Sequence, residues 1–212
     1  MTNFRTPTMG TYGATWEYGG YNGCGNIHPI IDSLNGAYVI VAGNASGVFA
    51  EVEKTLKERP DALVFAVNDV GMYLPNVDHW LSLHYNSLLA WRAVRWLENT
   101  SHTYTHSIAD GIGFDYSWHG LSPLFALSGY FAAQVAHIMG AGRIVLCGCP
   151  GDETPRFFEH SKRADNFQYG GGKSQYDKSI QTQLRNEMKR VPVFAEKIRS
   201  TSGWTAHYFG SP

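Results

Sequence analysis

Three short, mostly apolar runs constrain the fold of this 212-residue chain more than any other feature. They span Tyr38–Ala42, Ala62–Val67 and Arg143–Cys147, and glycine or asparagine follows each of them directly. Strands that are apolar along their whole length are typical of parallel sheets covered by helices on both faces. The runs therefore predict an α/β protein built on a buried parallel sheet.

Segments with helical spacing lie between these runs. In the segment 48–59, Val48, Val52 and Leu56 share one stripe, and Pro60 ends the pattern. The alternation of strands and helices predicts a Rossmann-like, doubly wound and mostly parallel sheet. Helices are also expected over 86–97, 128–139 and 177–199, the last interrupted at Pro192, and strands over 77–83 and 204–209.

The chain divides into an arm and one domain. Residues 1–36 are rich in Gly, Tyr, Asn and Thr and show no helical or strand period, which indicates an irregular N-terminal arm. The arm either packs on the domain or forms an oligomer contact, so a homo-oligomer stays open. Residues 37–212 are expected to form a single Rossmann-like nucleotide-binding domain. Two long loops, 100–120 and 149–176, interrupt it, and the second is expected to act as a lid.

Composition excludes several classes of function. The net charge of −1 argues against a nucleic-acid partner, which would require a basic face. No segment approaches the roughly 20 apolar residues of a membrane span, and the N-terminus lacks a signal-peptide pattern. The three cysteines, Cys24, Cys147 and Cys149, fit neither a disulfide framework nor a metal knuckle. We therefore expect a cytoplasmic protein with reduced thiols.

The ends of the expected strands carry the candidate binding residues, because ligands of open parallel sheets bind beyond the carboxyl ends of the strands. Glycines there allow close approach of a ligand, and helix N-termini favour anions. Each position also has a purely structural interpretation as a turn residue or a helix cap. The candidates are Gly43, Asn44 and Ser46 after the first strand, Asn68 and Asp69 after the second, Gly148 after a later strand, and Ser128 and Gly129 at a helix start.

Histidines and lid tyrosines supply the candidate catalytic groups. The chain has nine histidines without a metal-ligand spacing, so no metal site is expected. His84 and His160 are the candidates for a general base, because they lie near a strand end and in the lid loop. Gly170–Ser174 lacks the earlier glycine of a Walker A motif, but the lid residues Tyr169 and Tyr176 could close over a phosphate.

Several of these motifs follow one another as in a known family. Val39–Ser46 resembles the strand and G-N-G-P-S opening of bacterial lipooligosaccharide sialyltransferases and of the related MptE-like proteins. Val67-Asn68 is similar to their second motif, and Ser128–Gly148 resembles their S-G … G … I-x-L-x-G-x-D segment. The resemblance covers about residues 37 to 150. The chain departs from the family at Ala45-Ser46-Gly47 and at Gly148-Cys149-Pro150.

The resemblance implies a nucleotide site and a transferase. In the sialyltransferases the matching residues hold the CMP part of the donor, and these roles would fall to Asn44, Asn68, Ser128 and Gly129. Tyr169, Tyr176 and His160 would match the family's lid tyrosines and base only loosely. We therefore expect a glycosyltransferase-like enzyme that uses a nucleotide-activated donor as substrate and needs no bound cofactor. The alternatives are a Mg²⁺-dependent, MptE-like pyrophosphoryl or phosphoryl transferase and a nucleotide-binding protein without catalysis.

Overall fold

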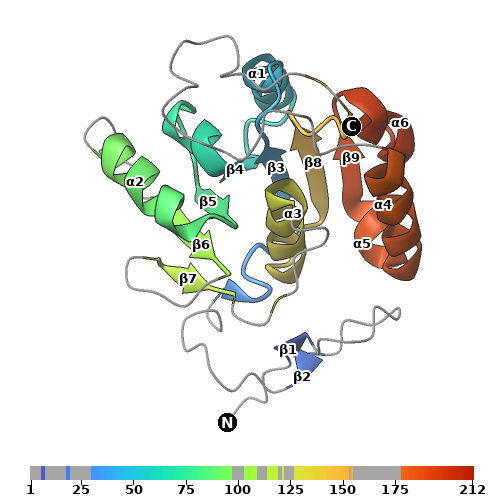
Figure 1. The fold of residues 1–212 in the computed structure, drawn as a ribbon, viewed down its shortest axis with the longest axis horizontal. Coiled ribbons are helices and arrows are strands. Elements are labelled where there is room, and N and C mark those ends of the chain that lie inside the picture. Colours follow the sequence, from blue (N-terminus) through green and yellow to red (C-terminus); the bar gives the residue numbers. More distant parts are fainter. Residues whose placement is uncertain are drawn as a thin grey trace.

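The computed structural model describes residues 6–7, 18–19, 30–96, 103–108, 114–118, 121, 127–152, 154 and 178–212. Its centre is a seven-stranded sheet with the order β7-β6-β5-β4-β3-β8-β9, and every pair of neighbouring strands is parallel (Figure 1). The strands are β3 (Tyr38–Ala42), β4 (Leu63–Val67), β5 (His79–Ser82), β6 (Tyr104–Ser107), β7 (Tyr116–Ser117), β8 (Arg143–Cys147) and β9 (Ile198–Ser200).

Helices cover both faces of this sheet, as the predicted doubly wound fold requires. Alternate residues of β3 enter two separate apolar clusters, Val39 and Val41 on one face and Ile40 and Ala42 on the other. The first cluster includes α3, α4 and α5, and the second includes α1 and α2. The helices are α1 (Val48–Glu58), α2 (Tyr85–Trp96), α3 (Ser128–Ile138), α4 (Lys178–Arg190), α5 (Pro192–Lys197) and α6 (Gly203–Phe209), with a 3-10 helix η2 (Asn68–Met72) after β4.

The strand order places a topological switch point between β3 and β8. From β3 the chain adds β4, β5, β6 and β7 outward on one side, and it then returns through α3 to pair β8 with the other side of β3. Connections that diverge in this way leave a crevice at the carboxyl ends of the two strands, where ligands of such folds bind. The residues that follow β3 and β8 are therefore the first place to look for a site.

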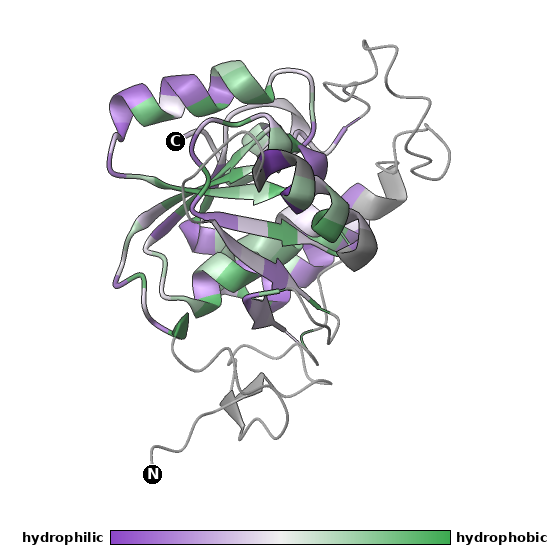
Figure 2. Cartoon of the chain, turned by 90° about the vertical axis from the view of Figure 1, so that its left-hand side faces the viewer, coloured by the Kyte–Doolittle hydropathy of each residue, from purple (hydrophilic) through white to green (hydrophobic). Residues whose placement is uncertain are grey.

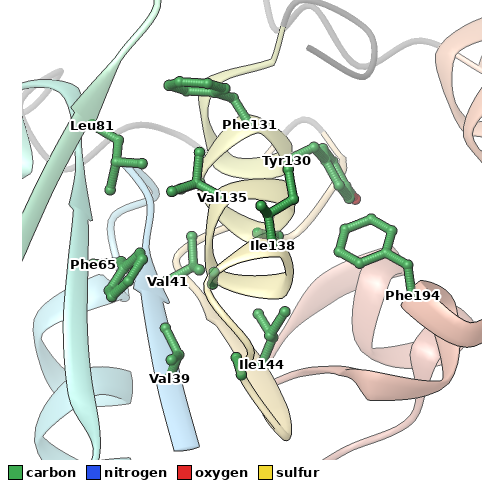
Figure 3. Packing of buried hydrophobic residues seen from close by; sticks show 14 of the residues in the cluster. Val39, Val41, Phe65, Leu81, Tyr130, Phe131, Val135, Ile138, Ile144 and Phe194 are labelled. Carbon is green, nitrogen blue, oxygen red and sulfur yellow. The ribbon is translucent and has the colours of Figure 1, made fainter. Parts of the chain in front are cut away.

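Helix α3 is the central element of one face. Its Val135 and Ile138 pack in the cluster that contains Val39 and Val41 of β3 and Ile144 of β8 (Figure 3). Fully burying a side chain of this kind stabilises a fold by about 1.5–3 kcal/mol. This packing fixes the axis of α3 across the sheet and brings its first residues to the carboxyl ends of the strands.

Most of the predicted elements are confirmed. The strands predicted over 38–42, 62–67, 77–83 and 143–147 match β3, β4, β5 and β8, and the first three predicted helices match α1, α2 and α3. The break predicted at Pro192 is also present: α4 ends at Arg190, and Pro192 begins α5, where its missing N–H costs nothing. Figure 2 shows hydrophobic residues concentrated on the central strands. Along the outer helices, hydrophobic and hydrophilic residues alternate.

The segment 100–120, predicted as an irregular loop, contains two further parallel strands, β6 and β7. Its sequence contains no apolar run, although it includes Ile108 and Ile112, and its Thr105, His106 and Ser107 are completely buried. Hydrogen bonds make this burial possible: the carboxylate of Asp115 accepts the Thr105 backbone N–H at 2.7 Å and its hydroxyl at 2.8 Å. The prediction was wrong because it relied on apolar runs.

The C-terminal prediction was also wrong, because residues 204–209 form helix α6 rather than the last strand. Trp204 and Tyr208 stand four residues apart and stack at 5.2 Å between ring centroids, which is a helical spacing. The last strand is β9, at residues 198–200, where a continuation of the preceding helix was expected.

Part of the predicted N-terminal arm is described. Residues 30–36 lie against the end of α3: the backbone N–H groups of Asp32, Leu34 and Gly36 donate to carbonyl groups of residues 138–140. Thr6–Pro7 and Tyr18–Gly19 pair as the antiparallel strands β1 and β2. Within the described residues, no helix combines the length and the apolar character needed to cross a membrane.

Candidate functional site

Asn44 and Asp69 form a polar pair at the carboxyl ends of β3 and β4. The Asn44 amide donates to a carboxylate oxygen of Asp69 at 2.5 Å, and Asp69 is only 8% exposed. This bond orients the amide, because the nitrogen must face the carboxylate. Among the described residues, the buried amide oxygen of Asn44 then has no hydrogen-bond partner. A buried acceptor without a partner is costly, and such atoms often mark functional positions.

Asn68 and Ser82 extend this polar pair toward β5. Asn68 has a left-handed backbone (φ 57°), which turns the chain sharply at the end of β4. Its side-chain oxygen accepts the hydroxyl of the fully buried Ser82 at 2.8 Å, and the Ser82 oxygen accepts the backbone N–H of His84 at 2.9 Å. The exposed His84 therefore stands next to Asn68 at the start of α2. We call Asn44, Asn68, Asp69 and Ser82 the amide side of the site.

The start of α3 differs from the sequence prediction. Ser128 is the first residue of the helix, and the cap position belongs to Leu127 in an extended conformation. Ser128 is 9% exposed, and its hydroxyl makes no hydrogen bond within the described residues. Ser46 does not cap α1 either, because that helix starts from Gly47 without a side-chain cap. The structural interpretation of both serines as caps is therefore wrong.

Gly43 and Gly129 both lie against the Cys149 thiol. A Cβ atom on Gly43 would stand 2.4 Å from this sulfur, and one on Gly129 would stand 3.1 Å from it. The structure thus brings the predicted Gly43 turn and the start of α3 together. Burial, reinforced by Cys147 and Glu51, raises the pKa of the Cys149 thiol. A raised pKa favours the neutral thiol at this position.

A carboxylate closes the other side of the switch point. Glu51 in the first turn of α1 accepts the backbone N–H of Gly148 at 2.6 Å and also the hydroxyl of Thr201. Gly148 has φ +63°, and its carbonyl accepts the N–H of Ala45 at 3.0 Å, so the exits of β3 and β8 are joined directly. Gly148 was predicted to be a binding residue, but its N–H is used internally. We call Glu51, Gly148 and Thr201 the carboxylate side.

The predicted site residues are only partly brought together. Gly43, Asn44, Asn68, Asp69, Ser128 and Gly129 lie around the carboxyl ends of β3 and β4 and the start of α3, whereas Ser46 is exposed on the turn before α1. His160, Tyr169 and Tyr176 lie outside the described residues. The described part of the chain contains no group of three His, Cys, Asp or Glu side chains able to hold a metal ion.

Sequence reasoning missed Ser82, Cys149 and Glu51. Ser82 ends a predicted strand, so the rule that selected Asn68 could also have selected it. Cys149 follows Gly148 after β8, which made it a candidate by position. No signal in the sequence points to Glu51, because its partners Gly148 and Thr201 are 97 and 150 residues away along the chain.

Comparisons of this chain with protein-family models, with curated proteins and with solved structures find no match.

Proposed function

We propose that this protein is a transferase that binds a nucleotide-activated donor, such as a nucleotide sugar, over the carboxyl ends of β3 and β4. The observation that carries the proposal is the Asn44 amide beside the switch point. Asp69 holds its nitrogen, and its buried oxygen has no partner in the described part of the chain. An acceptor in this position suits a hydroxyl or amino group of a nucleoside. The resemblance of residues 37–150 to sialyltransferase-like proteins agrees with such a ligand.

The N-termini of α1 and α3, both at this edge of the sheet, differ in how favourably they would bind a phosphate. The first turn of α1 already holds the carboxylate of Glu51, which would repel a second anion beside the Gly148 N–H. The first turn of α3 has no acidic residue and no side-chain cap, so its backbone N–H groups favour an anion. The donor phosphate would therefore lie at the start of α3, with the nucleoside on the amide side.

The proposed reaction moves a glycosyl group to an acceptor hydroxyl. The acceptor oxygen attacks the donor carbon, and the bond from that carbon to the phosphate oxygen breaks, with its electron pair leaving on the nucleotide. A histidine takes the acceptor proton, and His84, next to Asn68 through Ser82, is the candidate within the described residues. His160 stays the second candidate. Backbone N–H groups of α3 would stabilise the departing phosphate without a metal.

Ligand binding tests the proposal first. Purified protein would be titrated by calorimetry and thermal shift with nucleoside monophosphates, nucleotide sugars and ATP, each with and without Mg²⁺, because a ligand of the native state raises its apparent stability. We expect a metal-independent shift with a nucleoside monophosphate, which Asn44→Ala should reduce and Asn186→Ala should retain in full. Asn186 is the matched control, since it is exposed on α4.

The other outcomes separate the alternatives. Stabilisation by ATP only in the presence of Mg²⁺ would contradict the glycosyltransferase-like proposal and favour the MptE-like pyrophosphoryl transfer. Binding without release of nucleotide from any nucleotide sugar would favour a non-catalytic nucleotide-binding protein. No shift with any nucleotide would reject the site altogether.

A further inference from the structure

Two buried histidines and a tryptophan form a hydrogen-bonded chain at the opposite region of the sheet from the switch point. The Trp118 indole N–H, just after β7, donates to Nδ1 of His106 on β6 at 2.9 Å. Nε2 of His106 lies 2.8 Å from Nδ1 of His79 on β5. Trp118, His106 and His79 are 2%, 0% and 7% exposed. These hydrogen bonds thus link three neighbouring strands inside the protein.

The chemistry of the indole fixes the proton positions. An indole N–H can only donate, so Nδ1 of His106 must be an acceptor and its proton must sit on Nε2. This proton is then donated to Nδ1 of His79, which leaves the proton of His79 on Nε2. A further proton could enter only at an Nδ1 atom that already accepts a hydrogen bond. Protonation of either ring therefore breaks one bond of the chain.

The surroundings do little to stabilise an imidazolium. Phe65 and Tyr104 contact the His79 ring at 4.4 and 5.4 Å between centroids, and Tyr116 contacts the His106 ring at 5.0 Å. The charge of Asp115 acts on His79, but its carboxylate is engaged by Thr105 and lies 4.0 Å from the Arg92 guanidinium.

Other charged groups near the pair are engaged elsewhere. Asp78, beside His79, accepts the Val64 N–H at 2.7 Å. Helix α3, which packs on β5 from this face, carries no acidic or basic residue other than His137, and that ring contacts Phe194. Burial lowers the pKa of His79 to about 4 and lowers the pKa of His106 well below its ordinary value.

Strand β7 lies at the edge of the sheet and has two residues. It pairs with β6 through His106↔Tyr116 and Ser107↔Ser117, and the backbone N–H groups of Asp115 and Trp118 donate to the carbonyl groups of Thr105 and Ser107. We propose that the Trp118–His106–His79 chain is an acid-sensitive latch, which keeps β7 on the sheet at neutral pH and releases it when a proton enters the histidine pair. This inference does not depend on the proposed transferase function.

The sign of the effect follows from the lowered pKa values. The closed state excludes the proton that an exposed histidine accepts near pH 6.5, so the open state takes up more protons below that pH. The latch is at full strength above about pH 6.5 and weakens as the pH falls toward 4, the lowered pKa of His79. Release should stay local, because the interior strand β3 has two full-length partners, β4 and β8.

Two measurements on the wild-type protein test the latch. Long-range ¹⁵N–¹H spectra should show both rings with the proton on Nε2 at pH 7 and no titration near pH 6.5. Hydrogen exchange, corrected for its intrinsic pH dependence, should lose about tenfold protection at residues 114–118 between pH 7 and 4.5, while residues 38–42 change little. An Nδ1–H tautomer, a normal titration, or equal changes in both segments would overturn the proposal.

The variant Trp118→Phe sharpens the test. Removing the indole N–H leaves Nδ1 of His106 able to accept a proton, so release of β7 should move about one pH unit higher. His207→Gln, which alters an exposed histidine on α6, is the control and should leave the release pH unchanged. An unchanged release pH in Trp118→Phe would contradict the latch, and the wild-type spectra decide the matter if this variant does not fold.

Discussion

The two sides of the switch point are built from similar groups but use them differently. On the carboxylate side, Glu51 satisfies the N–H of Gly148 and the hydroxyl of Thr201, so polar groups there serve one another. On the amide side, Asn44 and Asp69 are paired, yet the Asn44 oxygen is buried without a partner. Internal satisfaction stabilises a fold, whereas a missing partner costs free energy that a ligand can recover.

This difference teaches where function can sit in a doubly wound sheet. Both sides occupy the carboxyl edge, so position alone does not distinguish them. What distinguishes them is whether the polar groups already have partners within the chain. The comparison predicts that changes on the carboxylate side alter stability, whereas changes on the amide side alter ligand affinity.

The largest expected effect comes from Gly43, which lies between the two sides. A Cβ atom there would stand 2.5 Å from the Gly148 carbonyl oxygen and 2.4 Å from the Cys149 sulfur. Gly43→Ala should lower the free energy of unfolding by about 3 kcal/mol, because backbone cannot move aside cheaply. Urea denaturation of the variant measures this loss.

Gly129→Ala is the matched control for Gly43→Ala. Its Cβ would meet only the Cys149 sulfur, at 3.1 Å, and alanine is the better helix former. We expect its stability to change by less than about 1 kcal/mol. Equal losses in the two variants would mean that the space around Cys149, and not the junction of β3 with β8, limits both positions.

The next effect is at Glu51. Glu51→Ala leaves the buried N–H of Gly148 without its acceptor and should cost about 2 kcal/mol in the free energy of unfolding. Glu53→Ala on the same helix is the control, since Glu53 forms an exposed pair with Lys57 and its loss should change stability very little. If Glu51→Ala and Glu53→Ala have the same free energy of unfolding, the polar groups of the carboxylate side do not stabilise the fold as the comparison requires.

Asn44 should show the reverse pattern. Asn44→Ala is expected to weaken nucleotide binding about tenfold, equivalent to about 1.4 kcal/mol, because it removes the oriented amide. Its free energy of unfolding should change less than that of Glu51→Ala, because removal of the orphaned Asn44 oxygen offsets part of the cost of the lost bond to Asp69. Calorimetric titration measures the affinity, and urea denaturation measures the free energy of unfolding. A loss of stability without a loss of affinity would mean that the amide side serves the fold and not the ligand.

The amide side could be predicted from sequence because its residues directly follow apolar strands. Asn44 and Asn68 stand where β3 and β4 end, and parallel strands bring such positions to one edge. The carboxylate side could not be predicted, because Glu51 is one of several acidic residues on α1 and only the tertiary structure brings Thr201 to it.

The same reasoning explains the errors in the fold. Strands β3, β4 and β8 are apolar and were found, whereas β6 buries Thr105, His106 and Ser107 and was missed. Buried polar strands depend on partners elsewhere in the chain, such as Asp115 and Trp118. The local pattern of apolar residues does not predict those partners.

The smallest expected effect concerns Ser128, at the start of α3. Because Leu127 rather than Ser128 occupies the cap position, Ser128→Ala should change the free energy of unfolding by less than about 0.5 kcal/mol, where loss of a capping serine typically costs about 1. A phosphate at this helix start would lose one hydrogen bond, so nucleotide affinity should fall about threefold.

Ser46→Ala at the start of α1 is the control for Ser128→Ala. Ser46 is exposed and is not the cap of its helix, and Glu51 already places a carboxylate at that helix start. Neither stability nor affinity should therefore change in Ser46→Ala. A loss of affinity in Ser46→Ala but not in Ser128→Ala would move the phosphate from α3 to α1, and the carboxylate of Glu51 would then have to leave Gly148 when the nucleotide binds.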